Sequence, residues 1–531
     1  MRVGIIVESE EVPAWVGELV KNINNYSNVQ LAMVIQLASD PEQENTPFKL
    51  FRKFDSTLLP GKPNLFERVK VNLTAETPVI LATPLGNENK NSMGAEDLAM
   101  IIKSQPDLIL NFSSKSFHGE ILELPKFGVC SLHFGDINRF GMSPAGFWEW
   151  YHNVPVSVVS ILRHNNVPLE SECLISTTTR TEYLSFSRNE TALFSKGVDL
   201  LTNMVLRLAD SGIQMEPMDA VQLNNHGLEE SPDFWNSLDA SVKLLSRAFI
   251  KSINKLLFLE QWVLFFSFNP QKFPQLNFQE VKALIPPKDR IWADPFVISK
   301  NGFHYVFIEE LFRKTNRGHI SCLVLNQAGN VEESRIIIER PYHLSYPYVF
   351  QHNDRWYMIP ESGENKTVDL FECTEFPFQW KFKKSLLTDI EAFDSTLHFH
   401  EEKVWLFCTI KKSQGASTDD DLYLYYSHDL LNGDWKQHPK NPVVSNPSSA
   451  RPAGRIFFHQ NSWYRPSQIC VPRYGYGLAL NKIVELSDSR YEEEVVSRAL
   501  PQWRRNLLSV HTLNFSESMM VIDGQLKRLK I

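Results

Sequence analysis

A repeat of about fifty residues runs through the second half of this 531-residue chain and restricts its fold more than any other feature. Four segments align as a strand, a polar turn and a second strand rich in aromatic residues: 293–310, 345–362, 393–410 and 452–468. Equivalent positions in these copies are Asp294, Tyr346, Asp394 and Ala453, and residues 509–524 form a weaker fifth copy. One small sheet cannot bury both of its faces, so units of this length stack radially. The repeat therefore predicts an all-β, five-bladed β-propeller over residues 276–531.

The first half of the chain follows a different pattern. Apolar runs typical of buried strands alternate with helical segments. These runs are residues 2–8, 29–37, 79–83, 108–112 and 129–134. The alternation predicts a multidomain protein in which residues 1–205 form an α/β, Rossmann-like, doubly wound sheet.

Residues 206–275 are predicted to link the two halves. Helical spacing over 239–257 places one set of apolar residues on a single face: Val242, Leu245, Phe249, Ile253 and Leu256. The strand expected at 261–268 lies just before the first repeat, where it could complete the last blade and close the ring.

Charge and cysteine usage limit the partners and the compartment. With 54 Lys and Arg against 62 Asp and Glu, the chain lacks the basic balance that binding to nucleic acid requires. The six scattered cysteines and the short apolar run at the N-terminus favour a cytoplasmic location, without disulfides or a structural metal. The apolar stretch 256–268 is too short to cross a bilayer, but a peripheral contact at the inner membrane surface stays open.

Residues 106–162 resemble the folate-dependent formyltransferases, which include the methionyl-tRNA and sugar N-formyltransferases. The resemblance rests on the PDLI strand, the LPKFG approach, the strand that bears His133 and the G-x-x-P turn at Gly141–Pro144. It implies 10-formyltetrahydrofolate as cofactor and an Asn–His–Asp catalytic set. This sequence has Ser131, His133 and Glu172 at those positions, and losing an oxyanion donor costs about 10²–10³ in rate. His133 could also be an ordinary histidine at a strand end, and His118, His152 and His164 are alternatives.

The repeat itself resembles the five-bladed propellers of family 43 glycosidases and the N-terminal domain of plant glucosamine inositolphosphorylceramide transferases. The matching segments are ADPFV at 293–297, FDST at 393–396, RPAGRIFF at 451–458, YRPSQ at 464–468 and HTLNF at 511–515. The glycosidase resemblance implies that Asp294 is a catalytic base and Asp394 its modulator. The acid position in the fourth blade holds Arg451–Arg455 and no carboxylate, which disfavours hydrolysis.

Arginine beside two aspartates suits a ligand with hydroxyls and an oxyanion. Arg451, Arg455, Glu309, Glu361 and His511 are therefore candidate ligands for a sugar, nucleotide-sugar or sugar phosphate. The competing interpretation is structural, because Asp at a blade start caps backbone amides and Arg–Asp pairs fasten neighbouring blades.

Three functions follow from these patterns. The first is a carbohydrate-active transferase of polysaccharide or glycolipid assembly, with an anionic sugar site in the propeller and a drifted formyltransferase-like domain. The second is a sugar N-formyltransferase, and the third is a non-catalytic binding or scaffold protein.

Overall fold

The computed structural model describes residues 1–38, 45–71, 73, 77–87, 90–140, 144–167, 170–213, 215–222, 231–268, 275–278 and 280–530. The chain divides into two compact units. Unit 1 comprises residues 1–250 with 413–417, and unit 2 comprises residues 251–412 with 418–531. The division falls within a helix of the segment 206–275 that the sequence suggests as a linker.

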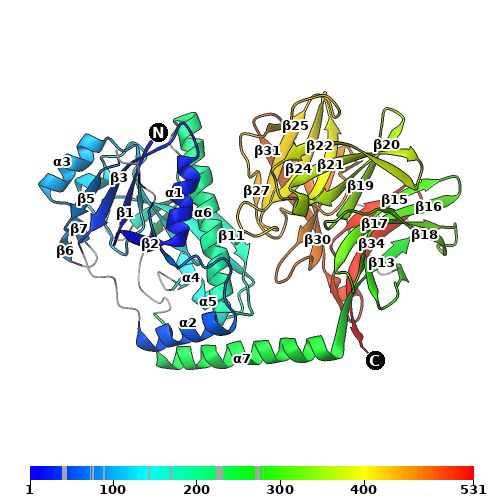
Figure 1. Cartoon of the computed structure of the whole chain (residues 1–531), viewed down its shortest axis with the longest axis horizontal. Coiled ribbons are helices and arrows are strands. Elements are labelled where there is room, and N and C mark those ends of the chain that lie inside the picture. Colours follow the sequence, from blue (N-terminus) through cyan, green and yellow to red (C-terminus); the bar gives the residue numbers. More distant parts are fainter. Residues whose placement is uncertain are drawn as a thin grey trace. The chain divides into compact units, whose positions relative to one another are not determined.

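Unit 1 is built on a mixed sheet that has eight strands in the described residues, in the order β12-β11-β10-β9-β8-β1-β3-β5 (Figure 1). The strands β9, β8, β1, β3 and β5 run parallel to one another, whereas β10 pairs antiparallel with β9, and β11 and β12 continue the antiparallel pairing. The bounds are β1 Arg2–Val7, β3 Gln30–Leu37, β5 Val79–Ala82, β8 Leu108–Asn111, β9 Val129–Phe134, β10 Val156–His164, β11 Glu170–Arg180 and β12 Asp219–Gln222.

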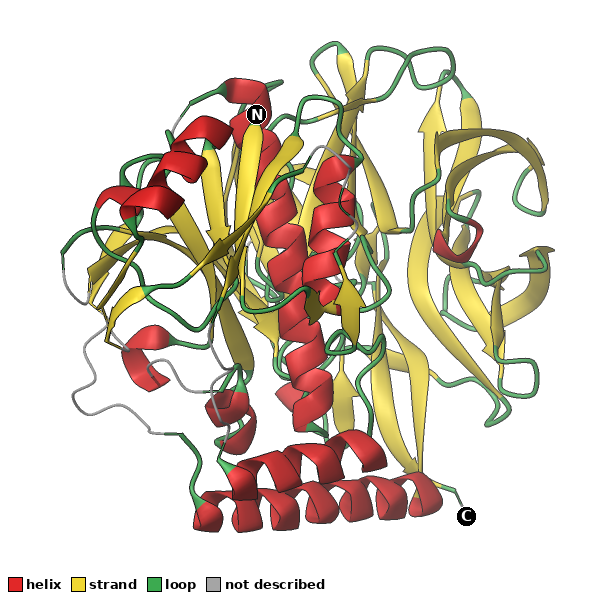
Figure 2. Ribbon diagram, turned by 60° about the vertical axis from the view of Figure 1, so that its left-hand side comes forward, coloured by secondary structure: helices red, strands yellow, loops and turns green. Residues whose placement is uncertain are grey.

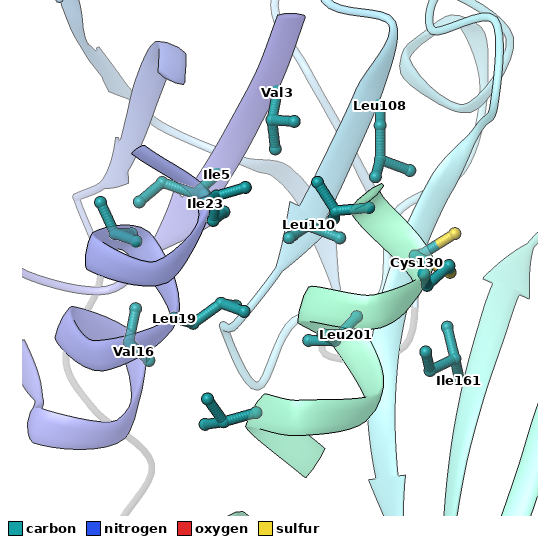
Figure 3. Packing of buried hydrophobic residues seen from close by; sticks show 14 of the residues in the cluster. Val3, Ile5, Val16, Leu19, Ile23, Leu108, Leu110, Cys130, Ile161 and Leu201 are labelled. Carbon is teal, nitrogen blue, oxygen red and sulfur yellow. The ribbon is translucent and has the colours of Figure 1, made fainter. Parts of the chain in front are cut away.

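Helices cover both faces of this sheet, because buried apolar residues point to both sides of its central strands. Helices α1 (Ala14–Asn24) and α6 (Phe186–Ser211) pack on the face that carries Val3, Ile5 and Leu110 (Figure 3). Helix α3 (Ala95–Ser104) and the short helix η1 (Glu120–Leu122) cover the other face. This agrees with the alternating pattern of the sequence.

Three further helices form an aromatic cluster beside the sheet. The helices α2 (Thr46–Leu58), α5 (Phe147–Tyr151) and α7 (Phe234–Leu257) share this cluster, and α2 and α7 lie side by side (Figure 2). The remaining short elements are β2 Glu11–Pro13, β4 Arg68–Lys70, β6 Leu85–Asn87, β7 Lys90–Ser92 and α4 Ile137–Phe140. The described part of the chain contains no helix with the length and apolar content needed to span a membrane.

Unit 2 is a β-propeller with five sheets in its described residues, which confirms the number of blades inferred from the repeat. Blade 1 has β15 Arg290–Lys300, β16 Phe303–Phe312, β17 Arg317–Leu325 and β18 Val331–Ile338. Blade 2 has β19 Ser345–His352, β20 Arg355–Ser362, η2 Gly363–Asn365, β21 Thr367–Glu375 and β22 Gln379–Thr388. Blade 3 has β23 Ala392–His400, β24 Lys403–Ile410, β25 Asp421–Ser427, β26 Lys436–Gln437 and β27 Val444–Ser445.

Blades 4 and 5 complete the ring. Blade 4 has β28 Phe457–His459, β29 Ser462–Ile469, β30 Gly477–Leu486, β31 Tyr491–Ala499 and the following η3 Pro501–Trp503. Blade 5 has β32 Leu507–Ser509, β33 Leu513–Phe515, β34 Met520–Leu529, β13 Phe258–Ser267 and β14 Lys282–Leu284. The strand β13 precedes the first repeat and pairs antiparallel with β34, near the C-terminus, so the predicted closing strand is present.

Equivalent residues of the repeat share an unusual backbone conformation. Asp294, Tyr346 and Asp394 have φ values of 50°, 41° and 50°, and each lies at an irregularity in strand register. Non-glycine residues rarely adopt positive φ. Its occurrence at three equivalent positions shows that the first strands of blades 1, 2 and 3 contain the same local irregularity. In blade 4 the positive φ falls on Gly454, one residue after the aligned Ala453.

Candidate functional site

The first strands of the blades begin at a central ring of residues that are fastened to one another from blade to blade. The backbone amide of Asp294 donates to Asp523 of blade 5 at 2.9 Å. The amide of Tyr346 donates to Asp294 at 3.2 Å, and the amide of Asp394 donates to Glu361 at 3.1 Å. A carboxylate of one blade therefore accepts the amide that opens the next, three times in succession. The capping of a backbone amide that was weighed for these aspartates is thus seen for the carboxylate of Asp294.

Arg451 joins blade 4 to this ring. Its Nε donates to Asp394 Oδ2 at 2.6 Å, its Nη1 lies 3.2 Å from Asp419 Oδ1, and its Nη2 lies 3.6 Å from Glu361 Oε2. The side chain of Arg451 is only 7% exposed, so its charge is neutralised by these carboxylates inside the protein. Burial raises the pKa of Asp394, while the guanidinium of Arg451 lowers it.

Arg455 is directed elsewhere. Its guanidinium donates to the carbonyl of Val349 in blade 2, and its amide donates to Asn514 Oδ1 at 2.9 Å. The structure therefore brings Arg451, but not Arg455, to a carboxylate of the ring.

His511 lies in a buried junction with Asp294 and Asp523. Its Nδ1 is 2.7 Å from Asp523 and its Nε2 is 3.6 Å from Asp294, while Trp262 stacks on the imidazole ring at 4.1 Å. Burial alone would lower the pKa of His511, but the two carboxylates outweigh it and raise the pKa to about 9. Burial also raises the pKa of Asp294, against the opposing effect of His511.

The three side chains of this junction lie close enough to hold a metal ion, with ligand atoms within 4.8 Å of one another. However, the carboxylate of Asp523 also accepts the backbone amides of Asp294, His511 and Thr512. Those donors occupy lone pairs that a cation would need. The arrangement favours a hydrogen-bonded junction over a metal site.

Three polar groups lie next to the ring, and we call Glu309, His343 and Glu361 the mouth; the side chains of Glu309 and Glu361 are 10% and 11% exposed. The Nε2 of His343 is 3.2 Å from Glu309 Oε1, and the His343 side chain is 35% exposed. The amide of Gly318 donates to His343 Nδ1, so His343 presents its Nε2 proton to Glu309. Glu309 and Glu361 are among the residues named from the sequence, whereas His343, the most exposed of the three, is not.

Aromatic rings flank the same centre. Phe393 and Tyr474 lie 5.4 Å and 5.0 Å from the Arg451 guanidinium, and Tyr474 is 36% exposed. Tyr474 also meets the His511 ring edge-on at 5.5 Å. Carboxylates, an imidazole and flat apolar faces are thus within reach of one another, as in pockets that bind small polar ligands.

In unit 1 the structure brings together only part of the predicted formyltransferase-like set. Ser131 and His133 lie on the same face of β9, because they are two residues apart on one strand. Ser131 Oγ is 2.8 Å from His164 Nε2, one of the alternative histidines. His133 Nε2 is buried and has no hydrogen-bond partner within the described residues, and burial lowers the pKa of His133 to about 4.

Glu172 is on the other face of the sheet. It is the cross-strand partner of Arg163, which it contacts at 2.5 Å, and Arg163 in turn lies opposite Cys130. The register of β10 and β11 shifts by one residue between Ile161 and Leu162. A shift of one residue moves a side chain to the opposite face, which separates Glu172 from His133.

A carboxylate other than Glu172 influences His133. Asp136 acts electrostatically on His133, and the amide of Asp136 donates to Glu149 Oε1 at 2.9 Å. Glu149 is 2% exposed, and burial raises its pKa. No sequence signal marks this pair, because α5 reaches the end of β9 only through tertiary packing. Residues 141–143 of the predicted G-x-x-P turn lie outside the described residues.

A separate cavity of about 260 Å³ lies at the carboxyl ends of β1 and β3. Its lining includes Val7, Ser9, Gln36 and Lys70. None of the site residues predicted from the sequence lines this cavity.

Residues 272–524 match the model of a family described as "Glucosamine inositolphosphorylceramide transferase 1, N-terminal". The propeller half is similar to that domain. Glucosamine inositolphosphorylceramide transferase 1 of Arabidopsis thaliana is 33% identical to this chain over 245 residues, which are 44% of this chain and 32% of the relative. The enzyme of the same name from Oryza sativa subsp. japonica is 32% identical over 216 residues, 40% of this chain and 29% of the relative. The chain spans less than a third of the length of these curated relatives.

Solved structures similar to this chain include a family 117 glycoside hydrolase of Zobellia galactanivorans, with a TM-score of 0.32 and 12% identity. That match covers 45% of this chain and 85% of the hydrolase. An exo-1,5-α-L-arabinanase from a bovine ruminal metagenomic library has a TM-score of 0.32 and 13% identity, covering 45% of this chain and 97% of the arabinanase.

Proposed function

We propose that this protein works as a transferase of glycolipid or polysaccharide assembly and that its propeller binds the sugar part of the substrate. The observation that carries the proposal is the match of residues 272–524 to the N-terminal domain of glucosamine inositolphosphorylceramide transferases. Relatives with that name are 32% and 33% identical to this chain over the matching residues. Their name contains an amino sugar and a lipid, which sets the substrate class proposed for this chain.

The sugar site that we propose is the mouth formed by Glu309, His343 and Glu361. Around it, carboxylates outnumber basic groups. The carboxylates are those of Asp294, Asp394, Asp419, Asp523, Glu309 and Glu361, and the basic groups are Arg451, His511 and His343. Burial raises the pKa of Asp294 and Asp394, but the other four carboxylates alone outnumber the three basic groups. This balance favours hydroxyls and an ammonium group, and it disfavours the phosphate or carboxylate that Arg451 first suggested. We therefore propose an amino sugar, with its ammonium group close to Glu309.

Catalysis by the buried ring is not part of the proposal. Asp294 and Asp394 already accept hydrogen bonds from Tyr346, Thr512, Gln468 and Arg451, so their oxygens are engaged in holding the blades. A base or nucleophile needs a lone pair that faces the substrate. This supports a binding role for the propeller.

The test measures the binding of methyl glucosaminide and of methyl glucoside to the full chain by saturation-transfer NMR. We expect the glucosaminide to bind more tightly than the glucoside, because only its ammonium group pairs with a carboxylate. Glu309→Gln should weaken glucosaminide binding by about tenfold or more, as a hydrogen bond to a charged group contributes about 1.5–3 kcal/mol. Glu402→Gln, in an exposed turn of blade 3, is the matched control. Failure of both sugars to bind, or equal binding by the Glu309 variant, would refute the site.

A second candidate function is sugar N-formyl transfer in unit 1, with 10-formyltetrahydrofolate as the donor. One observation favours it: the buried His133 Nε2 lacks a hydrogen-bond partner among the described residues and could therefore bind a ligand. The position of Glu172 does not fit, since its carboxylate is held by Arg163 on the opposite face. Folate binding by the full chain that is lost in His133→Ala would support this function, and absence of any folate binding would exclude it.

A further inference from the structure

Helix α7, whose course is shown in Figure 1, carries an exposed apolar stripe along its length. The stripe consists of Trp235, Leu238, Val242, Leu245, Phe249 and Leu256, whose exposed fractions lie between 49% and 72%. The residues of α7 that are buried are mostly small, namely Ser237 and Ala240, together with Leu244. The helix therefore packs through its small residues and leaves its large apolar side chains in water. An exposed stripe of this kind usually marks a surface that binds something.

The opposite side of α7 is basic. Lys243, Arg247, Lys251 and Lys255 follow one another at intervals of four residues, and Asp239 is the single acidic residue between positions 234 and 257. Lys243 pairs with Asp239, and Arg247 donates to the carbonyls of Tyr183 and Trp150, so these two bases are held within unit 1. Lys251 and Lys255 are exposed. A spacing of four places these bases along one side of a helix. An apolar face rich in Trp, Phe and Leu combined with a Lys- and Arg-rich polar face is the pattern of helices that lie in a membrane interface.

The end of strand β34 adds charge at the C-terminal end of α7. Lys527 Nζ donates to Asn254 Oδ1 at 2.8 Å, and the amide of Lys530 donates to the carbonyl of Leu257 at 3.1 Å. Arg528 lies between these two lysines in sequence, and Leu529 beside it is 58% exposed. Basic and exposed apolar side chains therefore meet again where the helix ends.

The width of the apolar surface favours a lipid layer over a second copy of the helix. A coiled-coil seam is narrow and is flanked by charged residues that pair between helices. In α7, Ile250 and Leu257 lie outside the stripe and are 57% and 46% exposed, so the apolar surface is broader than a seam. Ser241 and Ser246 occupy flanking positions where a paired helix would carry charges.

We infer that α7 binds along the surface of an anionic membrane, with the stripe in the interface and the exposed Lys251 and Lys255 near the acidic headgroups. This inference uses only α7 and the end of β34, and it does not depend on the proposed sugar site. Each base close to an anionic surface contributes about 1 kcal/mol, which is about fivefold in binding. The apolar side chains add attraction that does not depend on lipid charge.

The experiment is sedimentation of the full chain with two kinds of vesicle, phosphatidylcholine alone and phosphatidylcholine with one-third phosphatidylserine. We expect strong binding to the anionic vesicles and weak binding to the neutral ones. Raising the salt from about 0.1 M to about 1 M shortens the Debye length from about 10 Å to about 3 Å and should release much of the bound protein. These vesicles contain no sugar, so their result is separate from the test of the mouth.

Two pairs of variants assign the binding to the two faces of the helix. Lys251→Gln/Lys255→Gln should weaken binding to anionic vesicles by about 25-fold, at about fivefold for each charge. Its control is Lys381→Gln/Lys436→Gln, which removes two exposed lysines from outer strands of blades 2 and 3. Phe249→Ser/Leu256→Ser should weaken binding by about tenfold or more, whereas Phe382→Ser, at a 47% exposed position, should not.

Two results would overturn the inference. The first is no binding to anionic vesicles, or binding that both helix variants leave unchanged. The second is a dimer in sedimentation velocity that Phe249→Ser/Leu256→Ser dissociates while vesicle binding is absent, which would identify a second copy of the chain as the partner.

Discussion

Replacement of Arg451 by methionine tests whether the centre of the propeller is a set of braces between blades. The variant removes a guanidinium whose side chain is 7% exposed and leaves Asp394 and Asp419, each 3% exposed, without their positive partner. Breaking a buried ion pair by removing one partner costs about 3–5 kcal/mol, because the remaining charge stays desolvated. We expect the free energy of unfolding of unit 2 to fall by that amount at pH 7.

Two further variants separate the charge from the packing. Asp394→Asn/Arg451→Met removes both members of the closest pair, so it should be less destabilised than Arg451→Met alone, with a coupling energy of about 1 kcal/mol or more. Arg355→Met removes an exposed arginine that pairs with Glu372, and it should cost less than about 1 kcal/mol. Burial already raises the pKa of Asp394, and loss of Arg451 raises it further. The folded variant then binds a proton that the unfolded chain does not, so its deficit should be smaller at pH 6 than at pH 8.

Denaturant unfolding of the full chain, monitored by hydrogen exchange and mass spectrometry, measures the loss of stability in each blade. Faster exchange should be concentrated in β23 and β29, which carry or adjoin the two partners. The reasoning is wrong if Arg451→Met costs less than about 1 kcal/mol, or if the double variant loses the sum of the two single losses.

Two other predictions follow from buried groups and from the backbone. Burial lowers the pKa of His133 to about 4, below its usual 6.5, so the unfolded chain binds more protons than the folded one. Unit 1 should therefore lose stability as the pH falls from 6.5 towards 4, by about 2 kcal/mol at pH 5 for this residue. This loss should vanish in His133→Gln when unfolding is compared at pH 7 and pH 5. Gly454→Ala should destabilise unit 2 by about 2 kcal/mol or more in thermal unfolding, because φ is 143° and a Cβ would lie 2.0 Å from the carbonyl oxygen of Leu513. Gly212→Ala, with φ of 63° and no atom within 4 Å of the added Cβ, should cost only about 1 kcal/mol. Equal losses in the two variants would contradict this prediction.

The propeller could be predicted from the sequence because its information is local and repeated. Each blade begins with the same strand–turn–strand pattern, and the aligned Asp294, Tyr346 and Asp394 share one backbone conformation in the structure. The alignment is less exact in blade 4, where Gly454 rather than Ala453 has positive φ. The α/β pattern of the first half was likewise readable, since buried parallel strands are apolar throughout.

The roles of the central residues could not be read in the same way. The sequence identified Asp294, Asp394 and Arg451 as a group. In the structure the carboxylate of Asp294 accepts the amide of Tyr346, 52 positions away, and the amide of Asp394 donates to Glu361, 33 positions away. His343 was missed because it lies between two blades and outside the repeat. In unit 1, one extra residue in β11 places Glu172 on the face away from His133, and a bulge of this kind leaves no trace in an alignment by motif.

Helix α7 shows what periodicity leaves undetermined. The spacing of Val242, Leu245, Phe249, Ile253 and Leu256 predicts an amphipathic helix, and a helix is present at that place. Spacing identifies a face but does not say what the face contacts. In this structure the small residues Ser237 and Ala240 pack against unit 1, so the large apolar residues remain exposed. Retaining such a surface in water costs free energy unless something covers it, and the exposed Lys251 and Lys255 on the same helix match an anionic lipid layer better than a second helix.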